Sequence, residues 1–330
     1  MLSRLFIFIV VFLISNILFR KFINKFANYF LDVPNNRSMH IIATPRGGGI
    51  IFISNTIISS LIYILIYGIS RELIMPFLIL PLGIVGLIDD SIRLSSKIKY
   101  IIQLLTCLAI YFASNLYIGI SFNSFYGLIL FILIIIFLTA IVNFVNFMDG
   151  IDGLVSSCMF ISILTSCFVL DIEKCYLILL STLFAFILLN WHPAKLFMGD
   201  TGSTFLAAIN ISLISLSENF FEALNLLMVL SPLLIDPFVC VLRRFSQGQN
   251  IFSPHKLHLY QRLNIAGLSQ DKICIIYISS TSLLAISNLF FDLRFTLLLV
   301  LITFIVGLSL DQVIAEPFIK TLRESKNKVL

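Results

Sequence analysis

Long apolar segments recur from one end of this chain to the other, and each approaches the length that crosses a lipid bilayer. A helix needs about 20 apolar residues to span the hydrocarbon core. Because backbone polar groups must be satisfied inside the bilayer, such segments fold as helices. The pattern predicts an all-α integral membrane protein, a polytopic bundle of about eleven transmembrane helices over residues 2–19, 47–67, 73–88, 98–118, 125–147, 154–170, 175–189, 203–216, 221–241, 272–290 and 294–310.

The composition supports this fold class. Of the 330 residues 59% are hydrophobic and 12% are charged, whereas soluble domains average roughly 25% charged residues. This excludes a soluble enzyme, a disordered chain and a secreted disulfide scaffold. No polar linker divides the chain, so we expect a single transmembrane domain over residues 1–330.

The distribution of Lys and Arg predicts the orientation of the helices. With eleven alternating spans, all but four of the 22 Lys and Arg residues fall on one side. An excess of these residues marks the cytoplasmic side, so we expect the N-terminus outside and the C-terminus in the cytoplasm. Segment 21–30 is compatible with a short interfacial helix or with an extension of the first span. The cytoplasmic loops that would form a site are 20–46, 89–97, 148–153, 190–202 and 242–271.

Acidic residues gather where the predicted helices meet these loops. Asp89 and Asp90 follow an apolar helix directly, and two adjacent carboxylates favour a divalent cation or a nearby Lys. The segment NFVNFMDGIDGL (143–154) places two amides and then two carboxylates at three-residue spacing. Such oxygen ligands suit Mg²⁺ and also recognise nucleobase edges. The aspartates against apolar helices on this side are Asp89, Asp90, Asp149, Asp152, Asp200 and Asp236.

Two glycine-rich segments lie at the same side. FMGDTGS (197–203) opens the eighth predicted span, and a helix start attracts phosphate through its free N–H groups and dipole. Gly199 and Gly202 are expected to let the backbone approach a ligand. Taken alone, Asp200 is compatible with an ordinary helix N-cap. The three glycines that end loop 32–49 likewise indicate close approach of the backbone to another group.

Cations and histidines occupy these loops as well. SPHKLHLYQRL (253–263) carries His255, His258 and Arg262, which are donors suited to phosphate. The His255-x-x-His258 pair would also suit a transition metal, but no Cys or Glu stands at a useful spacing in the sequence. We therefore favour phosphate contacts over zinc. Further basic residues of this kind are Arg37, His40, Arg46, Arg243 and Arg244.

Acidic metal ligands and basic phosphate contacts at one membrane face together indicate phosphoryl transfer between a soluble nucleotide and a lipid. Mg²⁺ held by one or two protein ligands would bridge a pyrophosphate, and positioning would do most of the catalysis. A multi-pass transporter is the competing class, but its charges lie near the bilayer midplane and often in repeated halves. A non-catalytic scaffold would not need clustered aspartates.

The Asp–Asp pair, NxxNxxDGIDGL, FMGDTGS and the basic HxxH loop, in this order, resemble the polyprenyl-phosphate N-acetylaminosugar-1-phosphate transferases over nearly the whole chain. The resemblance implies transfer of a sugar-1-phosphate from a UDP-N-acetylaminosugar to undecaprenyl phosphate, with release of UMP and with Mg²⁺, or Mn²⁺, as cofactor. It implies a multi-pass protein of the bacterial inner membrane whose active site faces the cytoplasm. It implies no nucleic-acid partner and leaves a homodimer open.

The resemblance also assigns roles to matching positions. Asp200 and Asn146 resemble the Mg²⁺ ligands, and Phe197 resembles a residue that stacks on the uracil base. The catalytic group is Asp89, Asp90, Asp200, His255 and His258, of which the two histidines resemble pyrophosphate contacts. The substrate-binding group is Asp149, Asp152, Asn190, Phe197, Lys99, Arg244 and Arg46.

Within the family, PNNRSMH, TPRGGG and PHKLHLYQRL most resemble the branch that initiates O-antigen or other surface polysaccharides. The histidine triplet typical of the peptidoglycan-precursor branch is absent. This argues against a UDP-muramoyl-pentapeptide donor and leaves a phospho-N-acetylmuramoyl-pentapeptide transferase as the alternative. The sequence does not select among GlcNAc, GalNAc, FucNAc and QuiNAc.

Overall fold

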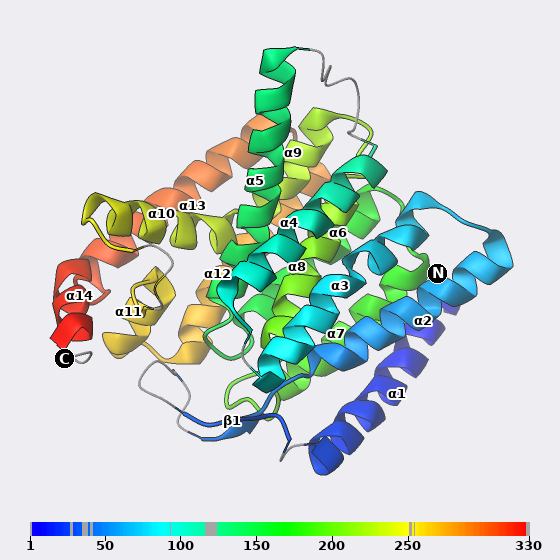
Figure 1. Cartoon of the computed structure of the whole chain (residues 1–330), viewed down its shortest axis with the longest axis horizontal. Coiled ribbons are helices and arrows are strands. Elements are labelled where there is room, and N and C mark those ends of the chain that lie inside the picture. Colours follow the sequence, from blue (N-terminus) through cyan, green and yellow to red (C-terminus); the bar gives the residue numbers. More distant parts are fainter. Residues whose placement is uncertain are drawn as a thin grey trace.

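The computed structural model describes residues 2–26, 29–34, 39, 42–92, 94–115, 124–250, 253 and 255–327, so Arg37 and His40 lie outside the described residues. Helices form nearly all of it (Figure 1). A two-residue antiparallel pair joins β1 (Leu31–Asp32) to β2 (Thr44–Pro45). The helices are α1 (Leu2–Phe26), α2 (Gly49–Tyr67), α3 (Arg71–Ile92), α4 (Ser96–Ala113), α5 (Phe125–Met148), α6 (Leu154–Val169), α7 (Lys174–Asn190), α8 (Gly199–Ile214), α9 (Phe220–Val229), α10 (Ser231–Ser246), α11 (Leu259–Ile265), α12 (Gln270–Phe290), α13 (Leu293–Val313) and α14 (Phe318–Asn327).

Helix α8 lies at the centre of the bundle. Every residue of α8 from Thr201 to Ile214 is buried, and the helix contacts α2, α3, α5, α6 and α9. A helix that is apolar all round is expected to be surrounded by other helices. The start of α8, which carries Asp200, is therefore held from several sides.

The outer helices expose large apolar side chains, as a surface that faces lipid requires. Examples are Phe6 in α1, Leu133 in α5 and Leu301 in α13, which are 69%, 56% and 53% exposed. Among the described residues, seven helices are long and apolar enough to cross a membrane, or eight if the bent pair α9–α10 forms one span. The all-helical membrane class is confirmed, whereas the predicted count of eleven spans is not established.

The predicted apolar segments coincide with helices, with one exception. Segment 221–241 is not one straight helix, because α9 and α10 meet at an angle of 79°. Pro232 lies in the first turn of α10, where a residue without an N–H group is tolerated, and this favours the start of a new helix there. Residues 21–26 continue α1, so this part of segment 21–30 is an extension of the first helix.

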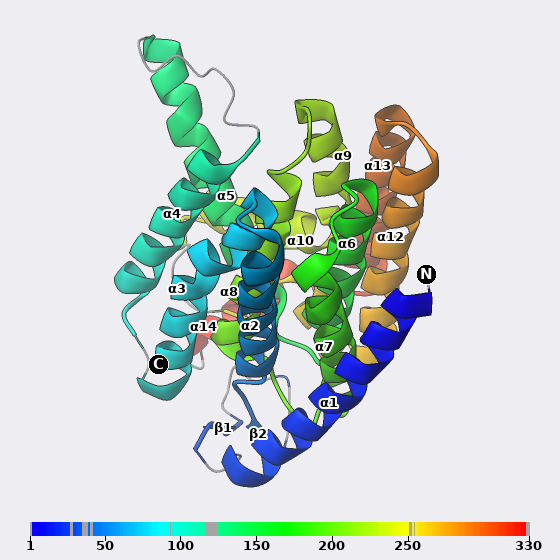
Figure 2. The same cartoon turned by 90° about the vertical axis from the view of Figure 1, so that its right-hand side faces the viewer.

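The predicted site loops meet at one end of the bundle. The backbone N–H of Gly49, at the start of α2, donates to the carbonyl of Met198 before α8, and Lys99 of α4 contacts Asp89 of α3. The β1–β2 hairpin lies at this end, beside the start of α2 (Figure 2). Loops that are far apart in sequence therefore come together here.

Candidate active site

Helices α3 and α8 meet at the candidate site through Asp90. Its carboxylate accepts hydrogen bonds from the backbone N–H groups of Asp200 and Thr201, at 3.2 and 3.3 Å, and from the Thr201 hydroxyl at 2.7 Å. The first N–H groups of a helix lack intrahelical partners, so a carboxylate placed there caps the helix and suits its dipole. Only 5% of Asp90 is exposed. Asp90 therefore positions the start of α8.

Glycines at this junction bring helices into close contact. A Cβ added to Gly86 would lie 2.5 Å from the Cα of Thr201, and one added to Gly49 would lie 2.6 Å from the Cα of Gly202. Gly199, with a φ of +72°, turns the chain into α8. For the two glycines that the sequence assigned to a ligand, the neighbours are protein groups: the Asp90 carboxylate lies against Gly199, and Phe52 and Gly49 of α2 lie against Gly202.

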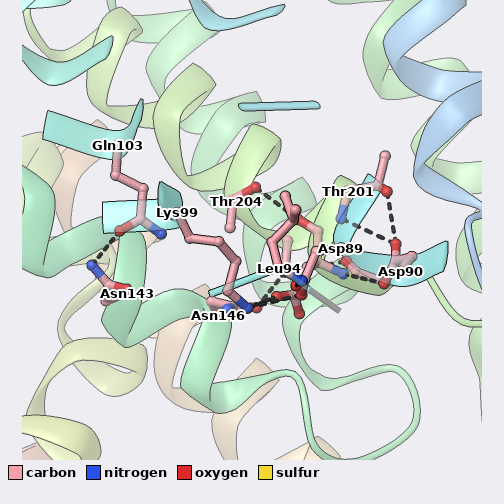
Figure 3. A network of polar contacts seen from close by, with 12 residues as sticks. Asp89, Asp90, Leu94, Lys99, Gln103, Asn143, Asn146, Thr201 and Thr204 are labelled. Carbon is pink, nitrogen blue, oxygen red and sulfur yellow. Dashed lines mark hydrogen bonds and ion pairs between the residues drawn. The ribbon is translucent and has the colours of Figure 1, made fainter. Parts of the chain in front are cut away.

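Lys99 bridges two aspartates from different helices. Its Nζ lies 2.8 Å from Oδ2 of Asp89 and 3.0 Å from Oδ2 of Asp200 (Figure 3). Oδ1 of Asp89 accepts a 2.7 Å hydrogen bond from the backbone N–H of Leu94, which orients the carboxylate. The side chains of Lys99 and Asp200 are 29% and 30% exposed. Three residues predicted from the sequence thus converge at a point that a substrate can reach.

The amides of the NxxN motif belong to the same network (Figure 3). Oδ1 of Asn146 accepts a 2.7 Å hydrogen bond from the hydroxyl of Ser203, in the first turns of α8. Nδ2 of Asn143 donates to Oε1 of Gln103 at 2.8 Å. Asn146 therefore lies against the start of α8, the segment that carries Asp200, and the two predicted metal ligands belong to one region.

The donor set of this region fits a magnesium ion. Asp200 and Asn146 offer carboxylate and amide oxygens, and Mg²⁺ commonly takes one or two such protein ligands together with phosphate oxygens. The Lys99 ammonium between Asp89 and Asp200 shows that this point favours positive charge. Asp200 and Asn146 are therefore the residues that could hold Mg²⁺.

Negative charge is concentrated around the network. Burial of Asp149, together with the negative charges of Asp200, Asp90 and Asp152, raises the pKa of the Asp149 carboxyl to about 8. Arg46, whose guanidinium lies 3.9 Å from Oδ1 of Asp90, offsets part of this charge. A divalent cation would relieve the remaining repulsion.

Asn190 ties two of the site loops together. It ends α7 and is only 4% exposed. Its amide oxygen accepts hydrogen bonds from the N–H of Gly153 at 3.1 Å and the hydroxyl of Ser156 at 2.8 Å, and its amide nitrogen donates to the carbonyl of Leu196 at 3.0 Å. Asn190 therefore connects the loop before α6 to the loop after α7, and both its amide oxygen and its amide nitrogen already have hydrogen-bond partners in the protein.

Asp152 joins the same two loops from the other side. Its Oδ2 lies 2.7 Å from Nδ1 of His192 and accepts a 3.0 Å hydrogen bond from the N–H of Ala194. The N–H of Asp152 donates to Oε1 of Gln270, at the start of α12. Asp152 is 7% exposed, so its predicted contact with uridine stays a prediction.

Phe197 has a fixed backbone and a partly exposed ring. Its N–H donates to the carbonyl of Pro45 at 2.8 Å, and its carbonyl accepts from the N–H of Gly48 at 2.9 Å. The ring stands three residues before Asp200 and is neither fully buried nor fully exposed. Phe197 is thus half-buried, and its stacking on a base stays a prediction.

The HxxH loop packs against the NxxN motif. The hydroxyl of Tyr260, in α11, donates to the carbonyl of Phe147 at 3.1 Å. The ring centroids of His255 and His258 are 4.9 Å apart, and that of His258 lies 6.1 Å from the ring of Phe147. The predicted histidine group and the predicted metal-ligand group therefore border each other.

Cys240 stands beside both histidines, which contradicts the expectation that no Cys accompanies them. One ligand atom from each of Cys240, His255 and His258 lies within 4.8 Å of the others. Residues 240 and 255 come from α10 and the following loop, so the sequence spacing did not indicate this. Burial, together with the charges of His258 and Arg244, lowers the pKa of His255 to about 3. The positive charge of Arg244 disfavours a metal cation here and favours an anion.

Arg244 itself organises the loop that follows α10. It is 1% exposed, and its guanidinium donates to the side chains of Gln249 at 3.2 Å and Ser253 at 2.7 Å and to the carbonyl of Asn250. The predicted phosphate contact of Arg244 would require an exchange of these bonds. The contact of Tyr260 with Phe147 carried no sequence signal, because a single tyrosine is common in helices.

Fold and site together define a polytopic α-helical membrane protein with a lysine and carboxylate cluster where its helices end. Residues 73–218 match the family described as "Glycosyl transferase family 4", and this range includes α8 and both motifs that carry aspartates before it. The chain is similar to this family over that range, and its resemblance to the polyprenyl-phosphate aminosugar-1-phosphate transferases is confirmed.

Curated relatives agree with this assignment. A probable undecaprenyl-phosphate N-acetylglucosaminyl 1-phosphate transferase of Bacillus subtilis is 29% identical over 268 residues, which cover 75% of this chain and 74% of the relative. A decaprenyl-phosphate N-acetylglucosaminephosphotransferase of Mycobacterium tuberculosis is 32% identical over 32% of this chain and 31% of its own length. A phospho-N-acetylmuramoyl-pentapeptide-transferase of Fervidobacterium nodosum is 27% identical over 79% of this chain and 89% of its own length.

Proposed function

We propose that this protein transfers an N-acetylaminosugar-1-phosphate from a UDP-sugar to undecaprenyl phosphate and releases UMP. The reaction would be the first membrane step of O-antigen or other surface polysaccharide assembly, at the cytoplasmic face of the bacterial inner membrane. The observation that supports it most is the Lys99 bridge between Asp89 and Asp200, since it gathers an ammonium and two carboxylates, the groups that would bind phosphate and a divalent cation.

The cluster supplies what phosphoryl transfer needs. An oxygen of the lipid phosphate forms a bond to the sugar-linked phosphorus, and the bond from that phosphorus to the bridging oxygen breaks, so UMP leaves with this oxygen. Mg²⁺ held by Asp200 and Asn146 would neutralise charge on the pyrophosphate. Lys99 binds phosphate oxygens beside it, and such fixed charges lower the barrier because they need no reorganisation.

The two adjacent aspartates have different surroundings, and we assign them different roles. Asp90 is committed to the start of α8. Asp89 faces Lys99, so it is the carboxylate that orients or deprotonates the lipid phosphate. Phe197 and Asp152 are assigned to the uridine, and His255 and His258 to the pyrophosphate.

The relatives guide the choice of donor. Those from B. subtilis and M. tuberculosis are named for N-acetylglucosamine, so UDP-GlcNAc is the first donor that we propose. The relative from F. nodosum acts on a muramoyl-pentapeptide by its name, and it belongs to the same kind of transferase. The missing histidine triplet argues against that donor for this chain.

The test uses purified protein in vesicles that contain undecaprenyl phosphate and Mg²⁺. UMP release and the lipid-linked product are measured with UDP-GlcNAc, UDP-GalNAc and UDP-MurNAc-pentapeptide in turn. We expect turnover with UDP-GlcNAc and its loss in Asp200→Asn, which keeps the backbone contact of residue 200 with Asp90. Turnover with the muramoyl donor alone, or normal turnover in Asp200→Asn, contradicts the proposal.

A further inference from the structure

Asp152 is held by protein groups at its backbone and at one oxygen of its carboxylate. Its N–H donates to Oε1 of Gln270 at 3.2 Å, and Nε2 of Gln270 donates to the carbonyl of Met39 at 3.0 Å. Its Oδ2 contacts Nδ1 of His192 at 2.7 Å and accepts a 3.0 Å hydrogen bond from the N–H of Ala194. Within the described part of the chain, no group donates to Oδ1 of Asp152. The carboxylate is therefore fixed through one oxygen and has the other available.

His192 is the side chain that fixes this carboxylate. The side chain of His192 is 38% exposed, whereas that of Asp152 is 7% exposed. An ionised carboxylate only accepts hydrogen bonds, so Nδ1 of His192 donates in this contact. Its length of 2.7 Å lies at the short end of the range for N–H donors. Because a carboxylate is planar, the bond that directs Oδ2 also sets the direction of Oδ1.

The loop between α7 and α8 carries both His192 and Phe197, the residue that we assign to stacking on the base. The N–H of Lys195 in this loop donates to the carbonyl of Leu189 at 2.7 Å, which closes the loop on the end of α7. Stacking on a ring tolerates any base, so the identity of the base must be recognised at its edge. Asp152, joined to the same loop, offers an acceptor for that purpose.

We propose that His192 is a positioning residue of the uridine site, which turns the Asp152 carboxylate so that its Oδ1 accepts the N3–H of uracil. This rests on the proposed function, in which Asp152 contacts the uridine. His192 touches no substrate and acts through Asp152. A binding group that is oriented before the ligand arrives loses less freedom on binding, and this raises the affinity. The ligand selected in this way is a nucleotide whose base has an N–H donor on its pairing edge.

The first measurement is nucleotide binding, which does not depend on transfer. The probes are UDP and 3-methyl-UDP, in which a methyl group replaces the N3 hydrogen, titrated into the purified protein with Mg²⁺. We expect the wild type to bind 3-methyl-UDP about 10- to 100-fold more weakly than UDP, because a hydrogen bond to a charged group is lost. His192→Phe keeps a ring but no donor, so UDP should bind more weakly and the ratio of the two affinities should fall to about 1–3.

Two further variants separate positioning from loop stability. His192→Asn places an amide N–H near the position of Nδ1 and should restore a large part of the discrimination between the two nucleotides. Lys195→Met changes an exposed position of the same loop and should leave the ratio at its wild-type value. A role in loop stability alone predicts equally weakened binding of both nucleotides in His192→Phe, together with a lower melting temperature. That result overturns the proposal, and so does a wild-type protein that binds both nucleotides equally.

The second measurement is transfer. His192→Phe should raise the KM for UDP-sugar about 10-fold and leave kcat within about twofold, the pattern of an interaction made equally in the ground state and the transition state. A fall in kcat with an unchanged KM overturns the proposal. A reduced ratio of the two nucleotide affinities in His192→Phe, in a protein that transfers no sugar, rejects the proposed function and keeps the role of His192.

Discussion

The ammonium of Lys99 lies 3.0 Å from a carboxylate oxygen of Asp200, although 101 positions separate the two residues. One residue comes from α4 and the other from the central helix α8. The same ammonium contacts Asp89 of α3. Helices α3, α4 and α8 therefore bring two carboxylates and one ammonium into contact. Loss of the ammonium should leave two carboxylates without their shared cation.

Lys99→Met leaves Asp89 and Asp200 without their shared cation. We expect turnover to fall by about 10²–10³, in the range seen when one fixed donor to transition-state charge is removed, with partial recovery at high Mg²⁺. UMP release measured against Mg²⁺ concentration checks this. Lys97→Met, two residues earlier at an exposed position of α4, is the matched control. Equal effects of the two substitutions would place Lys99 outside the site.

The Asp89 and Asp90 variants should separate activity from stability. Asp89→Asn should lower the transfer rate by about 10²–10⁴, the usual range for a catalytic acid or base, with thermal stability and UDP-sugar binding retained. Asp90→Ala removes the cap of α8 and should cost about 0.5–2 kcal/mol of stability. Thermal melts and nucleotide-binding measurements on both variants test these two roles. Lost nucleotide binding in Asp89→Asn would reassign this residue to the donor site.

The position of the site could be predicted from the sequence, because motifs and positive charges alternate consistently with apolar helices. The chemistry of single side chains could not. Asp90, Asn190 and Arg244 look like ligand contacts in the sequence, yet each is buried and bonded to a neighbouring loop or helix. The sequence shows which residue type stands at a helix end. The group that this residue contacts depends on how the helices and loops pack.

The fold shows the same division. The apolar segments predicted where the long helices form, because a helix that is buried in lipid or protein must consist mainly of apolar residues. The break between α9 and α10 was missed, although Pro232 marks it, because a proline in the first turn of a helix and one inside a span look alike in the sequence. The three glycines at the start of α2 signalled close approach, but only packing shows that α8 is the partner of Gly49.

Gly86→Ala tests that close approach. The new methyl group would lie 2.5 Å from the Cα of Thr201, and backbone cannot move aside as a flexible side chain can. We expect α8 to shift, with a loss of about 1–3 kcal/mol typical of overpacking and a loss of transfer activity. Gly307→Ala in α13, where a Cβ meets nothing within 4 Å, is the control. Thermal melts and UMP release should change in the first variant alone.

Phe197→Ala should weaken binding of the UDP-sugar more than that of the lipid. Stacking on a base contributes about 1–3 kcal/mol, so the KM for the donor should rise roughly 5- to 150-fold while the KM for undecaprenyl phosphate stays near its original value. Phe245→Ala, at an exposed position of α10, controls for the loss of an aromatic ring at the same end of the bundle. An unchanged KM for the donor would show that Phe197 contributes to packing and not to nucleotide binding.

His255 should not titrate during turnover. Its pKa lies near 3, below the ordinary value of 6.5, because burial disfavours the charged imidazolium. A base with a lowered pKa gives up its proton at lower pH, so His255 is neutral throughout an assay between pH 5 and 9. We therefore expect His255→Asn to lower the rate, through a lost neutral hydrogen bond, without moving the acid limb of the pH–rate profile. The measurement is kcat/KM for UDP-sugar across this range, with His258→Asn compared in parallel. If the acid limb shifts only in His255→Asn, then His255 carries a charge and its environment in the working enzyme differs from the one described here.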